Sequence, residues 1–161
     1  MIEIRNGSAF NAKGGILCQL VHCQGMDDGG SLQAFATAYP TAYHAYIGYC
    51  EDCSKQFGET AVMLGDTIIF KEEAGRSCCM FAQNQRGGNG LQYINYNAFR
   101  MCCAKLRFFL RKYRLEDIDI NMSSDIGCVE AGGDIDAIKE ILNDELAECN
   151  VILWRECKDD K

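Results

Sequence analysis

The sequence predicts an α/β fold in which helices cover both faces of a sheet. Short apolar runs typical of buried strands alternate with longer segments whose apolar residues recur at helical spacing. Glycine-bearing loops follow three of the expected strands, over residues 23–31, 83–90 and 126–133. Ligands of such sheets bind at the carboxyl ends of the strands, so these loops are the first candidates for a binding site.

The first expected strand of this kind is the apolar run over 16–22, bounded by Gly14 and Gly15 before it and a glycine-rich stretch after it. Aromatic and apolar residues at helical spacing then predict helices over 31–39 and 41–55. Pro40 suits the first turn of the second helix.

The middle of the chain is expected to form further strands. Residues 62–64 and 67–70 are expected to be strands joined by a tight turn at Gly65 and Asp66. Residues 78–82 predict another buried strand, which runs into a polar, glycine-rich loop.

The last third alternates helix and strand. Residues 95–113 predict a long amphipathic helix, whose solvated polar face accounts for the basic run over 105–114. Residues 117–122 alternate carboxylates with isoleucines and read as a strand. Asp134 is expected to cap the last helix, and residues 151–154 to form the last strand.

Length and composition limit the class of protein. The 161 residues fit one domain spanning 1–161, and 48% hydrophobic residues with one proline indicate a packed core. The net charge of -7 argues against duplex nucleic acid as a partner, because that binding depends on neutralising phosphates. No apolar run reaches the ~18 to 20 residues of a membrane helix, and no targeting segment is evident. We therefore expect a cytoplasmic protein with no membrane partner, and the oligomeric state stays open.

Eleven cysteines could suggest disulfides, but the number is odd and many lie inside apolar stretches, which favours reduced, buried thiols. Cys50 and Cys53 form a C-x-x-C pair. No second pair completes a zinc site, and this pair ends a helical pattern, whereas a redox pair starts a helix. We expect no metal and no cofactor, and a zinc or redox protein remains a third alternative.

Two of the loops share a setting that suits a phosphate. Gly25, Gly29 and Gly30 lie between a strand and a helix, where backbone amides can approach an anion and the helix start adds partial positive charge. Residues 126–133 again join a strand to a helix. Either loop alone could be a tight turn, but their repetition favours a site that grips a pyrophosphate from both sides.

These loops resemble those of macro domains. Val21-His22-Cys23-Gln24-Gly25-Met26 with Gly29-Gly30 resembles the first phosphate loop, and Ile126-Gly127-Cys128 with Ala131-Gly132-Gly133-Asp134 resembles the second. Phe81-Ala82-Gln83 and Ile94-Asn95-Tyr96 are similar to the segment between them, especially in bacterial and phage members. The resemblance covers nearly the whole chain. It implies a three-layer α/β/α fold with a mixed central sheet and an ADP-ribose pocket, with both loops around the diphosphate and the first near the distal ribose.

The resemblance also implies the ligand-binding residues, which lie in these loops and in the segments beside them. They are Gly7, Ser8, Cys23, Gln24, Gly25, Met26, Gly29, Gly30, Ser31, Ala82, Gln83, Asn84, Ile126, Gly127, Cys128, Val129, Glu130, Ala131 and Gly132.

Some positions depart from the family pattern. After the first strand the family often has an aspartate for the adenine amino group, where Gly7-Ser8-Ala9 offers only a hydroxyl. In the second loop Val129 replaces a glycine and Glu130 an apolar residue. One glycohydrolase subgroup has a nucleophilic lysine at the position of Gln83 and an aspartate at that of Ala131. A lysine adduct is therefore not expected here.

The candidate catalytic residues are Asp27, Asp28 and His22, which could orient or activate a water. A carboxylate ~5 Å from a phosphate costs about 3 kcal/mol at an effective dielectric of ~20. We therefore expect Asp27 and Asp28 to turn outward, contact ribose hydroxyls, recruit a cation or form a solvated acidic turn. His22 could equally be a hydrogen-bonded core residue. His44 is expected at the surface, and Cys23 and Cys128 to serve packing.

Two functions follow from the resemblance. The first is an ADP-ribose-binding macro domain that hydrolyses ADP-ribosyl linkages or ADP-ribose 1''-phosphate. The second is a non-catalytic module that sequesters an ADP-ribose-derived signalling nucleotide, as a phage protein countering a host defence would do. The fold alone does not choose between them.

Overall fold

The computed structural model describes residues 2–25, 30–59, 61–85, 91–128 and 131–157. Six strands form one sheet: β1 Ile2–Asn6, β2 Ile16–His22, β3 Thr67–Glu72, β4 Gly75–Gln83, β5 Asp119–Ser123 and β6 Asn150–Arg155. Their order is β1-β6-β5-β2-β4-β3, and all neighbours are parallel except the antiparallel pair β3 and β4. The expected mixed sheet is confirmed.

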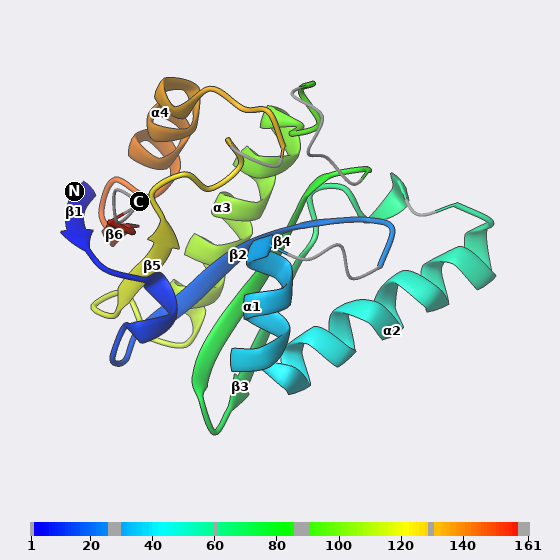
Figure 1. Cartoon of the computed structure of the whole chain (residues 1–161), viewed down its shortest axis with the longest axis horizontal. Helices are drawn as coiled ribbons and strands as arrows, with labels where there is room; N and C mark the ends of the chain where they lie inside the picture. Colours follow the sequence, from blue (N-terminus) through cyan, green and yellow to red (C-terminus); the bar gives the residue numbers. More distant parts are fainter. Residues whose placement is uncertain (1, 26–29, 60, 86–90, 129–130, 158–161) are drawn as a thin grey trace.

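Helices cover both faces of this sheet (Figure 1). The helices are α1 Gly30–Ala38, α2 Pro40–Phe57, α3 Tyr96–Lys112 and α4 Ile135–Glu145, with short 3-10 turns η1 Ala9–Asn11 and η2 Ala61–Met63. Helices α1 and α2 pack on one face, and α3 and α4 on the other. This is the three-layer α/β/α arrangement that the sequence predicted. Among the described helices, none combines the length and the apolar character needed to cross a membrane.

Strand β2 contributes to both apolar layers, because successive side chains of a strand point to opposite faces. Ile16 and Cys18 pack with α3 and α4, whereas Leu17 and Val21 pack with α1 and α2. A parallel strand buried on both faces is a nearly continuous apolar run, which explains why this strand was predicted with its observed bounds. The buried cysteines are divided in the same way; Cys78 lies in one layer and Cys79 in the other.

The predicted helix starts are also confirmed. Pro40 occupies the first turn of α2. The Oδ1 of Asn95 accepts a 2.9 Å hydrogen bond from the Ala98 N–H at the start of α3. The Oδ1 of Asp134 accepts a 3.0 Å bond from the Asp136 N–H at the start of α4. Each side chain satisfies a backbone donor that the first turn leaves without an intrahelical acceptor.

The prediction of a strand over 62–64 is wrong. The segment forms the 3-10 turn η2, with a 3.1 Å bond from the Leu64 N–H to the Ala61 carbonyl and a 2.9 Å bond from the Asp66 N–H to the Met63 carbonyl. Met63 is fully buried among residues of α1 and α2. A three-residue apolar run is too short to distinguish a strand from a buried turn, because both place apolar side chains in the core.

The basic face of α3 is exposed, as expected, and it also forms ion pairs. Arg100 pairs with Asp144 and Glu145, Arg107 pairs with Glu145, and Arg111 pairs with Glu148 at 3.0 to 3.2 Å. These contacts join α3 to the end of α4, so the basic run is an interhelical contact as well as a surface. Exposed pairs of this kind contribute about 0 to 1 kcal/mol each, so they orient the two helices more than they stabilise them.

Strands β2 and β5 are neighbours over a short stretch only. Their register pairs Ile16 with Ile120 and Leu17 with Asn121, whereas β2 stays paired with β4 as far as His22. Strands β4 and β3 lie on one side of β2, and β5, β6 and β1 lie on the other. The strand order changes direction between β2 and β5, which makes this position a topological switch point, where open α/β sheets bind their ligands.

Candidate ligand-binding site

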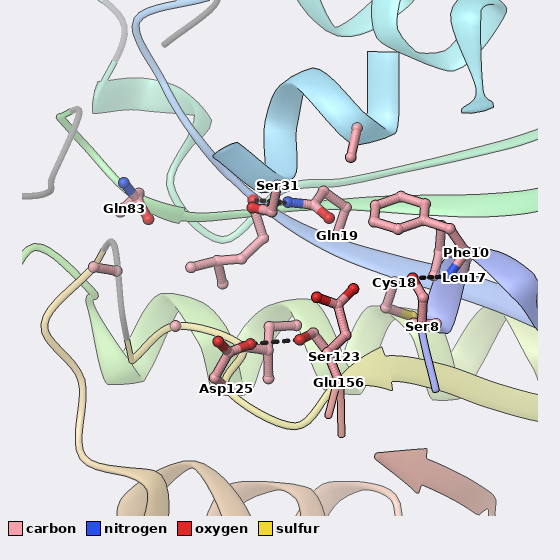
Figure 2. A pocket seen from close by; sticks show the side chains of 16 residues that line it. Ser8, Phe10, Leu17, Cys18, Gln19, Ser31, Gln83, Ser123, Asp125 and Glu156 are labelled. Atoms are coloured by element: carbon pink, nitrogen blue, oxygen red, sulfur yellow. Dashed lines mark hydrogen bonds between the residues drawn. The ribbon is translucent and has the colours of Figure 1, made fainter. Parts of the chain in front are cut away.

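A cavity of about 410 Å³ lies where β2 and β5 separate (Figure 2). Its volume falls within the range of about 300 to 1,000 Å³ that is usual for small-molecule sites. The lining comes from β2, from the start of α1, and from residues at or beyond the carboxyl ends of the other parallel strands. It comprises Ser8, Ala9, Phe10, Leu17, Cys18, Gln19, Leu20, Ser31, Ala34, Gln83, Ser123, Asp125, Ile126, Gly127, Ala131 and Glu156.

One wall is the beginning of α1. Ser31 and Ala34, on the first turns of this helix, line the cavity. The Nε2 of Gln19 donates a 3.1 Å hydrogen bond to the Oγ of Ser31 and a 3.2 Å bond to the Leu20 carbonyl. The bond to Ser31 therefore joins the start of α1 to β2. The backbone amides of a first helical turn lack intrahelical acceptors and carry partial positive charge, so this wall suits an anion.

The facing wall is the second glycine-bearing loop. Ile126, Gly127 and Ala131 line the cavity. The loop is held by a 2.9 Å bond from the Cys128 N–H to the Asp125 carbonyl and a 2.8 Å bond from the Gly133 N–H to the Gly127 carbonyl. Among the hydrogen bonds between described residues, the Gly127 N–H donates none. It is therefore an available donor at the cavity wall.

Backbone conformation or packing favours glycine at three positions of this loop: 127, 132 and 133, where a Cβ on Gly133 would lie 2.5 Å from the Gly127 carbonyl oxygen. Gly127 has φ +72°, and a Cβ there would lie 2.8 Å from the Cδ1 of Ile94. Gly132 has φ +66°, and a Cβ there would lie 2.1 Å from the carbonyl oxygen of Leu91. The second loop is thus pressed against the segment that precedes α3, and this contact fixes its course beside the cavity.

Gly25 serves packing as well. Its φ is +66°, and a Cβ there would lie 2.6 Å from the Cβ of Cys50 on α2. Gly25 is not part of the cavity lining. The structure therefore explains this glycine by close approach to a helix, where the sequence suggested approach to a phosphate.

The charged side chains of the described lining are both acidic. Asp125 follows the end of β5 and accepts a hydrogen bond from the Ser123 hydroxyl, and Glu156 follows the end of β6. Figure 2 shows the two carboxylates at different places along the cavity. Because the described lining contains no lysine or arginine, its anion donors are neutral groups, namely backbone amides and the hydroxyls and side-chain amides of the lining.

His22 lies in the core beneath α2. It is 3% exposed, and its Nδ1 accepts a 3.2 Å hydrogen bond from the Gln24 N–H. The hydroxyl of Tyr46 donates a 2.7 Å bond to the His22 carbonyl and lies 3.2 Å from Nδ1. Burial raises the pKa of Tyr46, which keeps this hydroxyl protonated. His22 is outside the cavity lining, so the geometry supports the hydrogen-bonded core interpretation.

The thiols near the two glycine-bearing loops have the properties of packing residues. Burial, with a contribution from Cys50, raises the pKa of Cys23 from its ordinary value of 9.0 to about 12. Cys50 and Cys53 are buried within α2, and the described residues hold no group of histidine, cysteine and carboxylate side chains suited to a metal. Burial also raises the pKa of Cys128. Thiols with raised pKa values are poor nucleophiles at neutral pH.

The structure brings six of the predicted ligand-binding residues to the cavity: Ser8, Ser31, Gln83, Ile126, Gly127 and Ala131. Asn84 lines a second, more open groove with Leu64 and residues 92–97. The other predictions whose position relative to the cavity is described lie outside its lining, namely Gly7, Cys23, Gln24, Gly25, Ala82, Cys128 and Gly132. Met26, Asp27, Asp28, Gly29, Val129 and Glu130 lie outside the described residues. His44 is exposed, as predicted.

Several lining residues were missed, chiefly Phe10, Gln19, Ser123, Asp125 and Glu156. Gln19 could have been found from the sequence, because it is a polar residue in the middle of the mainly apolar strand 16–22. Ser123, Asp125 and Glu156 lie at or just beyond the carboxyl ends of β5 and β6. Searching every parallel strand end for polar side chains would have found them.

Taken together, the sheet order and the cavity define a doubly wound α/β protein with a candidate ligand site at the switch point. No sequence-family model and no curated protein matches the chain. Several solved structures are similar to this chain in fold. A Bacteroides thetaiotaomicron protein of unknown function aligns with a TM-score of 0.78 at 21% identity, over 96% of this chain and 98% of that one.

Two further similar structures are macrodomain proteins or contain one. The macrodomain of Mycobacterium tuberculosis DarG aligns with a TM-score of 0.75 at 16% identity, over 96% of this chain and 97% of that one. Thermosipho africanus DarTG, solved in complex with ADP-ribose, aligns with a TM-score of 0.75 at 10% identity, over 99% of this chain and 43% of that one. The fold of this chain is the macro domain fold, as the sequence resemblance predicted.

Proposed function

We propose that this chain is a macro domain, spanning residues 1–161, that binds ADP-ribose in the cavity between β2 and β5. The observation that carries the proposal is the convergence of the α1 start and the second loop on one cavity, through Ser31 on one side and Gly127 on the other. Support comes from the similar Thermosipho africanus structure, which holds ADP-ribose.

The geometry favours one orientation of the nucleotide. The diphosphate belongs between the first turn of α1 and the Gly127 N–H, because these supply backbone donors. Ser8 and Phe10 lie at one end of the cavity, with Gln83 toward the other (Figure 2). The aromatic ring suits the base, so the distal ribose belongs near Gln83.

Hydrolysis of ADP-ribosyl linkages, or of ADP-ribose 1''-phosphate, is the finer proposal. It depends on Asp27 and Asp28, which lie outside the described residues. The described lining offers no histidine or lysine as a base, and His22 lies in the core. The position of His22 outside the cavity favours the second candidate, a non-catalytic module that sequesters an ADP-ribose-derived nucleotide.

Calorimetry with ADP-ribose tests binding directly. We expect saturable binding with one site per chain, and Ala34→Trp should abolish it, because this alanine of α1 lines the cavity and an indole there would fill it. Gly48→Trp is the control for the effect of the substitution itself, because Gly48 lies on α2 with open space around it. A wild-type protein that shows no heat of binding, and no thermal shift with ADP-ribose, overturns the proposal.

Hydrolysis is tested by incubating the protein with ADP-ribose 1''-phosphate or an ADP-ribosylated peptide and separating the products by chromatography. If Asp28 positions a water, Asp28→Ala should reduce turnover more than affinity. Equal loss of both removes the catalytic assignment. Intact ligand after long incubation with wild-type protein supports the sequestering module.

A further inference from the structure

We propose that Glu156 selects the base of the bound nucleotide by accepting a hydrogen bond from its exocyclic amine. The inference deepens the proposed function and rests on it, since it takes the cavity to hold a nucleotide. It assigns to β6, the last strand of the chain, a specificity role that neither the sequence nor the shape of the loops indicated.

The sheet brings Glu156 beside the residues that follow β1. Strands β1 and β6 are paired in parallel as far as Asn6 and Arg155, and the Gly7 N–H donates a 2.9 Å bond to the Arg155 carbonyl. Ser8 and Glu156 therefore leave adjacent strands at the same edge, and both line the cavity. Figure 2 shows the Glu156 carboxylate pointing into the cavity that Ser8 and Phe10 also line.

Ser8 is already engaged with the backbone. Its Oγ accepts a 3.3 Å hydrogen bond from the Phe10 N–H and caps η1. Glu156 differs, because its side chain makes no hydrogen bond or ion pair with any described residue. The nearby cation on β1, Arg5, is paired with Glu3 at 2.6 Å. Among the described residues, Glu156 thus supplies an unengaged acceptor at this end of the cavity.

A cavity lined by such a carboxylate and by the aromatic ring of Phe10 favours a flat ring that carries a hydrogen-bond donor. The amino group of adenine is such a donor. The keto oxygen of hypoxanthine, at the same position of the purine, would instead place two acceptors against each other. A site that matches a donor with an acceptor discriminates against the analogue that lacks the donor, because the hydrogen bond is then lost.

The test compares two ligands that differ at this one group. ADP-ribose and inosine diphosphate ribose are titrated by calorimetry into wild-type protein, Glu156→Gln and Glu156→Ala. We expect wild-type protein to prefer ADP-ribose by about tenfold or more. Glu156→Gln should bring the two affinities to within about threefold, because a glutamine amide can donate to the keto oxygen as well as accept from the amine. Glu156→Ala should weaken ADP-ribose more than its inosine analogue.

Glu148→Gln is the matched control, since this carboxylate is 82% exposed and pairs with Arg111 on α3, outside the cavity. It should leave both affinities unchanged. If the ratio of the two affinities is the same in wild-type protein and Glu156→Gln, the inference is overturned while the proposed function stands. A uniform loss for both ligands would assign Glu156 to the ribose and also overturn it. A wild-type protein that binds neither ligand overturns both proposals.

Discussion

The side-chain amide of Gln19 donates a 3.1 Å hydrogen bond to the hydroxyl of Ser31, joining the middle of β2 to the first turn of α1. Gln19 is 9% exposed and borders the cavity, as Ser31 does. A glutamine in a buried strand is costly unless its polar atoms are paired, so this bond explains why a polar residue is tolerated there. It also fixes the part of α1 that we propose to face the diphosphate.

Gln19→Leu is therefore expected to weaken ADP-ribose binding without unfolding the protein. The leucine keeps most of the volume but loses the bond that holds the start of α1. We expect a loss of about tenfold in affinity, which is about 1.4 kcal/mol, measured by calorimetry. Gln33→Leu is the control, because Gln33 is exposed on the same helix and does not line the cavity. Wild-type affinity in Gln19→Leu would show that the bond does not position the site.

Gly127→Ala should disturb the second loop. The substitution places a Cβ 2.8 Å from the Cδ1 of Ile94 and forces alanine to adopt φ +72°. We expect a loss of about 1 to 3 kcal/mol in the free energy of unfolding, and weaker ADP-ribose binding, because the loop must shift. Urea denaturation and calorimetry measure the two effects.

Gly14→Ala separates strain from contact in this experiment. Gly14 has φ +78°, similar to that of Gly127, but a Cβ there would meet nothing within 4 Å. It should lose stability only through its backbone conformation and keep its affinity for ADP-ribose. Equal effects of the two substitutions would mean that the contact with Ile94 does not matter.

The fold could be predicted because its main signals are local. The apolar run of β2, Pro40 in the first turn of α2 and the cap at Asp134 each depend on residues within one element. The strand prediction for 62–64 failed because three apolar residues fit a buried 3-10 turn as well as a strand. The ion pairs of the exposed basic face of α3 were not foreseen for a different reason: the partners, Asp144, Glu145 and Glu148, are about 40 residues away in the sequence.

The candidate site was predicted less completely, because it is assembled by the sheet order. Ser31 and Gly127 were found because glycine-rich loops are visible in the sequence. Gln19 and Glu156 were missed, since nothing local places β2 and the end of β6 around one cavity. The expectation for Gly25 shows the converse limit, because a glycine needed for contact with α2 looks the same in sequence as one needed for contact with a phosphate.

Stability should fall in alkaline solution because of the buried thiols. Cys23 is 0% exposed, and burial raises its pKa from 9.0 to about 12, as burial does for Cys50. Between these pH values the unfolded chain has lost protons that the folded chain retains. The free energy of unfolding therefore decreases as pH rises from about 9, by at most about 1.4 kcal/mol per pH unit for each thiol.

The contribution of one thiol can be isolated with Cys23→Ala. Urea denaturation at pH 7, 9 and 10 should give a shallower alkaline decrease for this variant than for wild-type protein. Cys157→Ala is the control, since Cys157 is exposed and should leave the slope unchanged. An identical slope for Cys23→Ala and wild-type protein would contradict the assignment.

The buried pair of Tyr46 and His22 should matter for stability and not for binding. Tyr46→Phe removes the hydroxyl that donates to the His22 carbonyl at 2.7 Å and leaves that buried acceptor without this donor. We expect a loss of about 1 to 3 kcal/mol in the free energy of unfolding. Tyr113→Phe is the matched control, because Tyr113 is 56% exposed and the same change there should cost little. ADP-ribose affinity should stay within about threefold of wild type in both variants, because neither tyrosine lines the cavity. A large loss of affinity in Tyr46→Phe, with stability unchanged, would contradict the interpretation of His22 as a core residue and would indicate that it acts on the ligand.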